Sequence, residues 1–252
     1  MPAKKRLDLL ILEKGLASSR QHAQALIMAG KVLVDTQRID KPGIRLPDDV
    51  SITIKDDDQV YVSRGGLKLQ AALEALHLDV QGLTCMDVGA STGGFTDCLL
   101  KHGARRVYAV DVGYGQLAWQ LRKDPRVIPI ERTNIRHMNP NRLPEKVELA
   151  TIDASFISLK VVVPPVRRFL TPDGKILALI KPQFEVGKGK VGKGGVVKDA
   201  QQHAEVIRDL TVFFTELGFE CGSVVPSPIQ GPKGNQEFMI LLSALSVDNS
   251  VL

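Results

Sequence analysis

The sequence predicts an α/β protein in which helices cover both faces of a mostly parallel sheet, preceded by a small α+β unit. From Cys85 onward, short apolar strands alternate with helical patterns, which is typical of such a sheet. Two apolar stretches near the end of the chain are expected to form a closing hairpin, while residues 4–45 show two helical patterns and a strand. A length of 252 residues with 44% hydrophobic residues is sufficient for one large domain and a small module.

Composition restricts the classes of function. No apolar run approaches the roughly 18 residues of a membrane span, and no signal peptide is recognisable, so we expect no membrane partner. The three cysteines are scattered without metal-ligand spacing, which favours a reducing, cytoplasmic location and predicts no metal site. The net charge of +5 permits a nucleic-acid partner, and nothing in the sequence implies an obligate protein partner.

The first unit is basic. A helix is expected from about Leu7, a second helix capped by Ser18 or Ser19 and ending at Gly30, and a strand over residues 31–35. Residues 4–45 carry nine Lys and Arg against four acids, whereas residues 46–60 carry five acids and one lysine. This segregation suits a phosphate backbone, although a solvated basic face is the alternative. The candidate RNA-binding residues here are Lys4, Lys5, Arg6, Arg20 and Lys31.

The second unit begins with a glycine-rich turn. A Gly65-Gly66 pair is a candidate hinge, and a helix is expected from Lys68 to Leu78. The stretch 84–97 then reads as strand, glycine loop and helix, an arrangement that exposes backbone N–H groups at the carboxyl edge of a parallel sheet. An ordinary strand-to-helix turn is the alternative. The candidate cofactor-binding residues of this stretch are Asp87, Gly89, Ala90, Ser91, Thr92, Gly93, Gly94 and Phe95.

A second strand ends in Asp111, about twenty residues past the glycine loop, where a carboxylate can accept both hydroxyls of a ribose. Val112 and Asn134, which follows an expected third strand at 127–130, are further candidate cofactor contacts. A dinucleotide is one possible ligand, but the loop Gly-Ala-Ser-Thr-Gly-Gly lacks the Gly-x-Gly-x-x-Gly order that admits a pyrophosphate. An adenosyl cofactor without pyrophosphate, such as S-adenosylmethionine, fits better.

Ionisable residues follow the later strands. Asp153 ends the expected strand 149–153 and is also a candidate cofactor contact, and Lys181 follows the apolar strand 176–180. The segment 186–197 is rich in Gly and Lys and is expected to hold phosphate or to cover a site through Lys188, Lys190 and Lys193, a plain flexible loop being the alternative. A helix over 200–217 and a hairpin of 219–225 with 237–242 complete the pattern.

The first unit resembles a known RNA-binding domain. The order Arg-Leu-Asp, Ser-Ser-Arg and Ala-Gly-Lys-Val-Leu-Val is similar to the small domain named after a ribosomal small-subunit protein, over about residues 5–55. That family usually has glycine in the turn after its first strand, where this chain has Thr36.

The rest of the chain resembles the FtsJ/RrmJ-like class of RNA ribose 2′-O-methyltransferases. The quoted motifs are Ser-Arg-Gly-Gly-Leu-Lys-Leu, Asp-Val-Gly-Ala-Ser-Thr-Gly-Gly-Phe-Thr-Asp, Asp-Ala-Ser-Phe-Ile-Ser, Ile-Lys-Pro-Gln-Phe-Glu and Gly-Asn-Gln-Glu-Phe. With the preceding module they look like the TlyA family, often labelled hemolysins. The resemblance implies a Rossmann-like, S-adenosylmethionine-dependent methyltransferase with a seven-stranded sheet and an antiparallel last strand. It also implies a catalytic tetrad of Lys68, Asp153, Lys181 and Glu237.

The expected domains are 1–60 for RNA binding, 61–67 as a linker, 68–246 for methyl transfer and 247–252 as a tail. The resemblance implies methylation of a cytidine 2′-hydroxyl in ribosomal RNA or ribosomal subunits.

Because a sugar hydroxyl is a poor nucleophile, a positioned base is useful, and we expect Lys181 in that role. Asp153 and Glu237 would orient it, while Lys68 would hold the substrate and favour the neutral amine. Arg64 is a further candidate RNA contact.

Two other functions remain open. The hemolysin label suggests a pore-forming protein, for which the sequence supplies no membrane span. A non-catalytic RNA-binding protein is the other, against which the intact tetrad argues.

Overall fold

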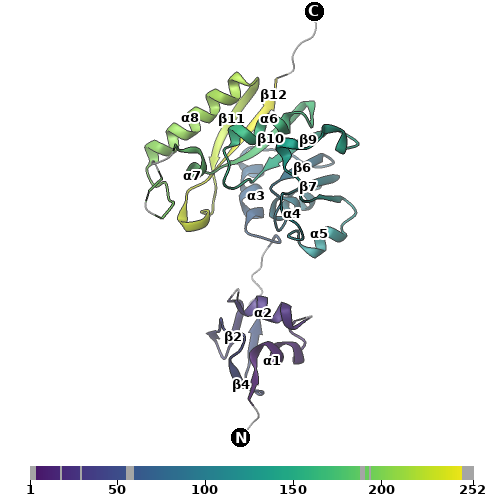
Figure 1. Cartoon of the computed structure of the whole chain (residues 1–252), viewed down its shortest axis with the longest axis vertical. Coiled ribbons are helices and arrows are strands. Elements are labelled where there is room, and N and C mark those ends of the chain that lie inside the picture. Colours follow the sequence, from purple (N-terminus) through teal and green to yellow (C-terminus); the bar gives the residue numbers. More distant parts are fainter. Residues whose placement is uncertain are drawn as a thin grey trace, which may run out of the picture. The chain divides into compact units, whose positions relative to one another are not determined.

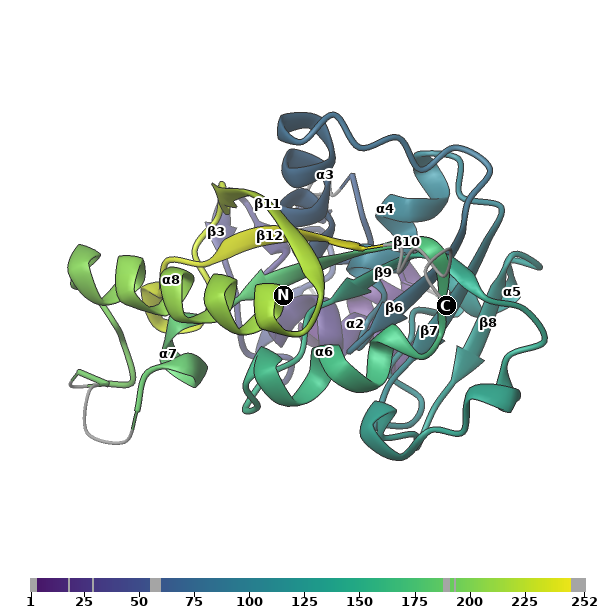
Figure 2. The same ribbon diagram turned by 90° about the horizontal axis from the view of Figure 1, so that it is seen from above.

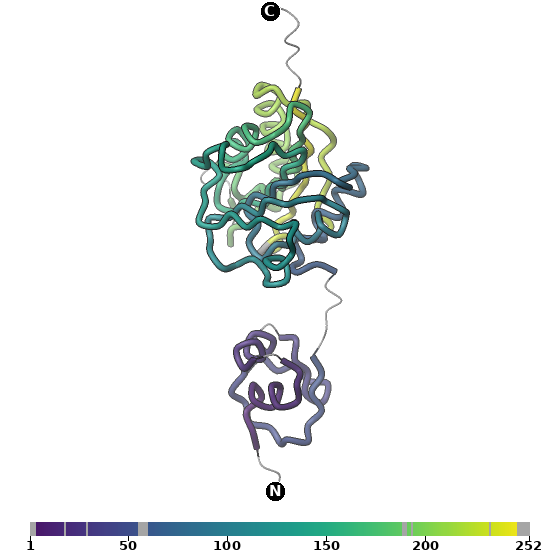
Figure 3. The backbone as a smooth tube through the Cα atoms, turned by 90° about the vertical axis from the view of Figure 1, so that its right-hand side faces the viewer, coloured from purple at the N-terminus to yellow at the C-terminus, as the bar shows by residue number. Residues whose placement is uncertain are grey.

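The chain forms two compact units, residues 1–59 and 60–252, each with its own hydrophobic core (Figures 1 and 3). The computed structural model describes residues 4–17, 19–28, 30–54, 60–187, 191–192 and 194–245. The predicted phosphate-binding lysines Lys188, Lys190 and Lys193 lie outside the described residues.

The first unit combines two helices with short antiparallel strands. Its elements are β1 (Lys4–Arg6), α1 (Leu7–Glu13), α2 (Arg20–Met28), β2 (Val32–Val34), β3 (Gln37–Arg38), β4 (Arg45–Pro47) and β5 (Ile52–Ile54). Strand β1 pairs with β4, and β2 lies between β3 and β5. Ser19 Oγ accepts a hydrogen bond from the backbone N–H of His22 at 3.1 Å, so Ser19 caps α2. The expected order of helix, helix and strand is confirmed.

The turn between β2 and β3 has an unusual backbone. Asp35 and Thr36 adopt φ values of +47° and +79°. Such angles suit the type I′ turn that joins adjacent strands in a hairpin, but a β-branched residue rarely adopts them. This explains why glycine is the usual residue at the position of Thr36 in the family that the first unit resembles.

The second unit is built on a seven-stranded sheet with the order β11-β12-β10-β9-β6-β7-β8. Its strands are β6 (Thr84–Val88), β7 (Arg106–Val110), β8 (Val127–Ile130), β9 (Val147–Ile152), β10 (Leu170–Ile180), β11 (Phe219–Pro226) and β12 (Phe238–Ala244). All neighbours from β10 to β8 pair in parallel, whereas β12 is antiparallel to both β10 and β11. The predicted sheet, including its closing hairpin, is confirmed.

Helices cover both faces of this sheet (Figure 2). The helices are α3 (Gly65–Ala75), α4 (Gly94–Lys101), α5 (Trp119–Lys123), α6 (Leu159–Arg167), α7 (Pro182–Glu185) and α8 (Ala200–Glu216), with 3-10 turns η1 (Ile135–His137), η2 (Pro140–Arg142) and η3 (Pro232–Gly234). Successive side chains of a strand point to opposite faces, so Cys85 packs with α3 and α4 while Met86 packs with α6 and α8. Sequence patterning did not predict α6, because Pro164 and Pro165 lie inside it.

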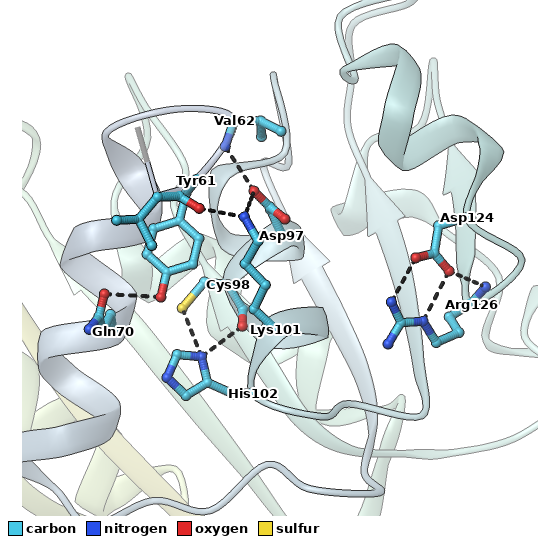
Figure 4. Close-up of polar contacts among 10 residues, drawn as sticks. Tyr61, Val62, Gln70, Asp97, Cys98, Lys101, His102, Asp124 and Arg126 are labelled. Carbon is cyan, nitrogen blue, oxygen red and sulfur yellow. Dashed lines mark hydrogen bonds and ion pairs between the residues drawn. The ribbon is translucent and has the colours of Figure 1, made fainter. Parts of the chain in front are cut away.

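The segment expected to be a linker, 61–67, belongs to the second unit. Tyr61 is buried in its core, and the backbone N–H of Val62 donates to Asp97 Oδ2 at 2.8 Å (Figure 4). Gly65 and Gly66 form the first turn of α3, and a Cβ on Gly66 would lie 2.3 Å from the Tyr61 ring. The glycine pair therefore permits close packing and does not form a hinge.

Candidate active site

The glycine loop lies against the end of the neighbouring strand. Gly89 has φ +84°, and a Cβ on it would stand 2.6 Å from the carbonyl oxygen of Asp153. Gly93 has φ +99° and precedes α4 directly. Because only glycine fits both the left-handed backbone and this close approach, the loop sequence brings the ends of β6 and β9 together at one point.

Asp87 supports this loop from below. It is fully buried, and its carboxylate accepts hydrogen bonds from Thr96 Oγ1 at 2.7 Å and Thr151 Oγ1 at 3.1 Å. Burial raises the pKa of Asp87 to about 7, while both threonine hydrogen bonds oppose the rise. Neither Asp87 nor Gly93, both expected as cofactor contacts, lines the cavities around the loop. Their place in the structure indicates that they shape the loop.

Asp111 holds two loops at the end of β7. Its Oδ2 accepts from the backbone N–H of Ser91 at 2.8 Å, and its Oδ1 accepts from that of Gly113 at 2.6 Å. A carboxylate oxygen can accept more than one hydrogen bond, so both oxygens retain capacity for ligand hydroxyls. Asp111 lines a cavity of about 490 Å³ whose other walls include Val112, Asn134, Ile135, Phe156 and Val162.

A second cavity, of about 540 Å³, lies on the other side of the glycine loop. It is lined by the first residues of α3 and α4 together with Arg64 and Lys68. The loop before η3 contributes Ile229, Gln230 and Gly231, which sequence reasoning did not single out. Two helix N-termini and Arg64 contribute positive charge to this cavity, and Asp153 also lines it.

The four predicted tetrad residues come together as two ion pairs. Lys68 Nζ lies 2.5 Å from Glu237 Oε2. Lys181 Nζ lies 2.6 Å from Asp153 Oδ1, but the angle of this second contact does not make it a hydrogen bond. Lys181 Nζ also donates to Ser155 Oγ at 2.8 Å. The sequence expectation made both carboxylates partners of Lys181, but Glu237 pairs with Lys68.

All four tetrad residues line a third cavity of about 500 Å³. The side chains of Lys68, Lys181 and Glu237 are at most 10% exposed, whereas the Asp153 side chain is 24% exposed. Among the described residues, nothing donates a hydrogen bond to Glu237 Oε1. Buried charges are costly to maintain even in pairs, so their concentration at one cavity indicates a functional site.

The three cavities share Gly89, Ser91 and Asp153 in their linings and therefore meet at the glycine loop. Ser155 and Phe156 were missed as individual site residues, although both lie in the Asp-Ala-Ser-Phe-Ile-Ser motif. Phe156 is 89% exposed with φ +63°, two features that no sequence pattern reveals.

Predicted RNA contacts of the first unit are partly engaged within it. Arg6 and Arg20 both contact the buried carboxylate of Asp8, at 3.0 Å in each case, and these contacts hold the pKa of Asp8 well below its usual range. Lys5 pairs with Glu13 at 2.7 Å. Lys4 is exposed and Lys31 is half-buried. The structure thus gathers two of the five predicted cations around one anchor.

Over the described part of the chain, no helix combines the length and the apolarity needed to cross a membrane.

Comparison with known proteins agrees with this geometry. Residues 61–244 match the FtsJ-like methyltransferase family, and residues 5–51 match the S4 domain. The chain is 47% identical to the 16S/23S rRNA (cytidine-2′-O)-methyltransferase TlyA of Mycobacterium tuberculosis, covering 96% of this chain and 91% of that protein. It is 38% identical to Hemolysin A of Brachyspira hyodysenteriae, covering 93% and 98% respectively.

A solved structure titled as a hemolysin, from Streptococcus thermophilus, superposes with a TM-score of 0.75 at 42% identity, covering 97% of this chain and 89% of that one. The glycine loop and the two ion pairs beside it lie within residues 61–244, the part of the chain that matches the methyltransferase family. The chain belongs to the FtsJ-like methyltransferases and carries an N-terminal S4 domain.

Proposed function

We propose that this protein transfers a methyl group from S-adenosylmethionine to the 2′-hydroxyl of a cytidine in ribosomal RNA. The observation that carries the proposal is the pair of buried ion pairs, Lys68 with Glu237 and Lys181 with Asp153, facing one cavity next to the glycine loop. The names of the relatives support cytidine as the methylated nucleoside and ribosomal RNA as the class of substrate. The S4 domain supports an RNA substrate.

The residues around the glycine loop fit S-adenosylmethionine. The cavity of about 490 Å³ offers apolar walls from Ile135, Phe156 and Val162 for a flat ring, and Asp111 for the ribose. The cavity of about 540 Å³, with Arg64 among its lining residues, suits the charged amino-acid end. When bound, S-adenosylmethionine supplies a methyl carbon made electrophilic by an adjacent sulfonium.

Lys181 would act as the base that takes the proton from the ribose 2′-hydroxyl, while the methyl–sulfur bond breaks and a neutral thioether leaves. Asp153 and Ser155 hold the amine at that position. A lysine amine can accept a proton only in its neutral form.

The decisive experiment is transfer of a tritiated methyl group from S-adenosylmethionine to ribosomal subunits and to naked rRNA, followed by nucleoside analysis. We expect 2′-O-methylcytidine with the wild-type protein. Lys181→Ala should lower kcat on the order of 10²- to 10⁴-fold while cofactor binding, measured by calorimetry, is retained. Lys175→Ala is the matched control, because Lys175 lies on β10, the strand that Lys181 follows, and lines none of the three cavities.

No incorporation into any RNA would refute the enzymatic proposal, and a fully active Lys181→Ala variant would refute the role of Lys181 alone. Erythrocyte lysis by the purified protein without cofactor would favour the pore-forming alternative.

A further inference from the structure

Two short loops carry the central pair of the tetrad. The first follows β9 and runs from Asp153 to Ser158, and the second follows β10 and runs from Lys181 through α7 to Glu185. Helix α7 has only four residues, fewer than an isolated helix needs for stability in water. The orientation of Lys181 therefore depends on contacts that anchor α7.

Glu185 supplies such an anchor at the far end of α7. Its Oε2 accepts a hydrogen bond from Ser158 Oγ at 2.6 Å, and its Oε1 accepts one from the backbone N–H of Leu159 at 2.8 Å. Ser158 is the N-cap of α6, and its Oγ accepts in turn from the backbone N–H of Lys160 at 3.1 Å. One carboxylate thus binds the end of the second loop to the end of the first.

The same two loops touch at two further points. Lys181 Nζ donates to Ser155 Oγ at 2.8 Å, and the rings of Phe156 and Phe184 lie tilted against each other with centroids 5.0 Å apart. Contacts at Lys181, at the ring of Phe184 and at Glu185 therefore run along the whole second loop. Since Lys181 lies at one end of this row, we expect loosening of the other end to shift α7 and to change the direction of the amine.

Glu185 does not line the third cavity, at which the four tetrad residues meet. That cavity is lined by Lys181, Gln183 and Phe184 but not by Glu185, which lines a separate cavity of about 70 Å³ toward α8. Glu185 consequently has no route to the substrate except through the loops that it joins. The mechanism above also assigns it no chemical step.

We propose that Glu185 is a positioning residue for methyl transfer, which joins the loops after β9 and β10 and so holds Lys181 against Asp153 and Ser155. This inference rests on the proposed function, because it gives Lys181 the role of base. A carboxylate suits the position because it accepts two hydrogen bonds at once, one from a hydroxyl and one from a backbone amide. Glutamine retains one acceptor oxygen, whereas alanine retains none.

The test compares Glu185→Ala, Glu185→Gln and Ser158→Ala, with Glu216→Ala on the exposed end of α8 as the control. We expect Glu185→Ala to lower kcat on the order of 10- to 100-fold, the scale of a small misplacement of a catalytic group. The KM for RNA and the affinity for S-adenosylmethionine should stay within about threefold of wild type. Glu185→Gln should recover part of kcat, and Ser158→Ala should resemble Glu185→Ala.

A double-mutant cycle then separates positioning from general damage. In a Lys181→Ala background, Glu185→Ala should cause no further loss of residual transfer, because its effect passes through Lys181. An equal loss in both backgrounds would overturn the proposal, as would wild-type kcat for Glu185→Ala. A parallel fall in cofactor affinity that glutamine does not rescue would also overturn it.

Labelling of lysine amines in the absence of RNA, followed by mass spectrometry, distinguishes failure of this inference from failure of the proposed function. Glu185→Ala should raise the labelling rate of Lys181 relative to Lys175, whatever reaction the protein catalyses. Unchanged labelling of Lys181 would refute the positioning role even if the wild-type protein methylates rRNA.

Discussion

Replacing Gly89 by alanine tests whether the glycine loop sets the position of Asp153. The new Cβ would stand 2.6 Å from the Asp153 carbonyl oxygen, 3.0 Å from its carbonyl carbon and 3.4 Å from Ala154 Cα. Moving from 2.6 Å to an ordinary contact near 3.4 Å requires the loop and the end of β9 to separate by about 0.8 Å. Both partners are backbone atoms, so side-chain rotation cannot relieve the contact.

Two costs follow, and a second glycine separates them. The backbone angle of +84° costs an alanine about 1–2 kcal/mol of folding stability. Gly82→Ala is the matched control, because Gly82 has φ +75° and nothing within 4 Å of the added Cβ. A displacement near 1 Å at a catalytic group costs on the order of 10²-fold in rate. We therefore expect both variants to lose the stability that the left-handed angle costs, and only Gly89→Ala to lose further stability from the backbone contact and about 10²-fold in kcat.

The assay measures single-turnover methyl transfer at saturating cofactor, with thermal unfolding of each variant in parallel. Single turnover isolates the chemical step from product release, so displacement of Asp153 appears directly in the rate. A Gly89→Ala variant with the kcat of Gly82→Ala and the same melting temperature would refute the reasoning.

Three further predictions concern charge and strain. Lys68→Met should destabilise the fold by about 3–5 kcal/mol by leaving Glu237 unpaired, and adding Glu237→Leu should restore stability in urea unfolding but not activity. Since burial raises the pKa of Asp87 to about 7, its contribution to stability is present at low pH and lost as pH rises through that value. The melting temperature of Asp87→Asn should therefore gain on wild type between about pH 4 and 7, and a constant difference over that range would contradict this. Thr36→Gly should relieve the angle of +79° and stabilise the first unit by roughly 0.5–1 kcal/mol, seen as slower amide exchange in β2; faster exchange would contradict it.

Local patterns predicted most of the fold. The alternation of apolar strands with helices, together with the closing pair of apolar stretches, predicted the sheet and its antiparallel last strand because strand and helix periods are properties of neighbouring residues. The expectation of a linker at 61–67 differs from the structure, in which this segment belongs to the second unit. The expectation arose because two adjacent glycines, taken locally, indicate flexibility. In the tertiary structure the ring of Tyr61 packs directly against Gly66, which leaves no room for a side chain there.

For the site, the sequence determined which ionisable residues follow strand ends, since a parallel sheet brings its carboxyl ends to one edge. The resemblance added Lys68, whose helix carries no local sign of function. The pairing of these groups was decided by tertiary structure alone. Lys68 and Glu237 are 169 positions apart in the chain, and their contact depends on how α3 packs on the sheet to which β12 belongs. The hydrogen bond between Ser158 and Glu185 is likewise decided by tertiary structure, because the fold brings the loops after β9 and β10 together.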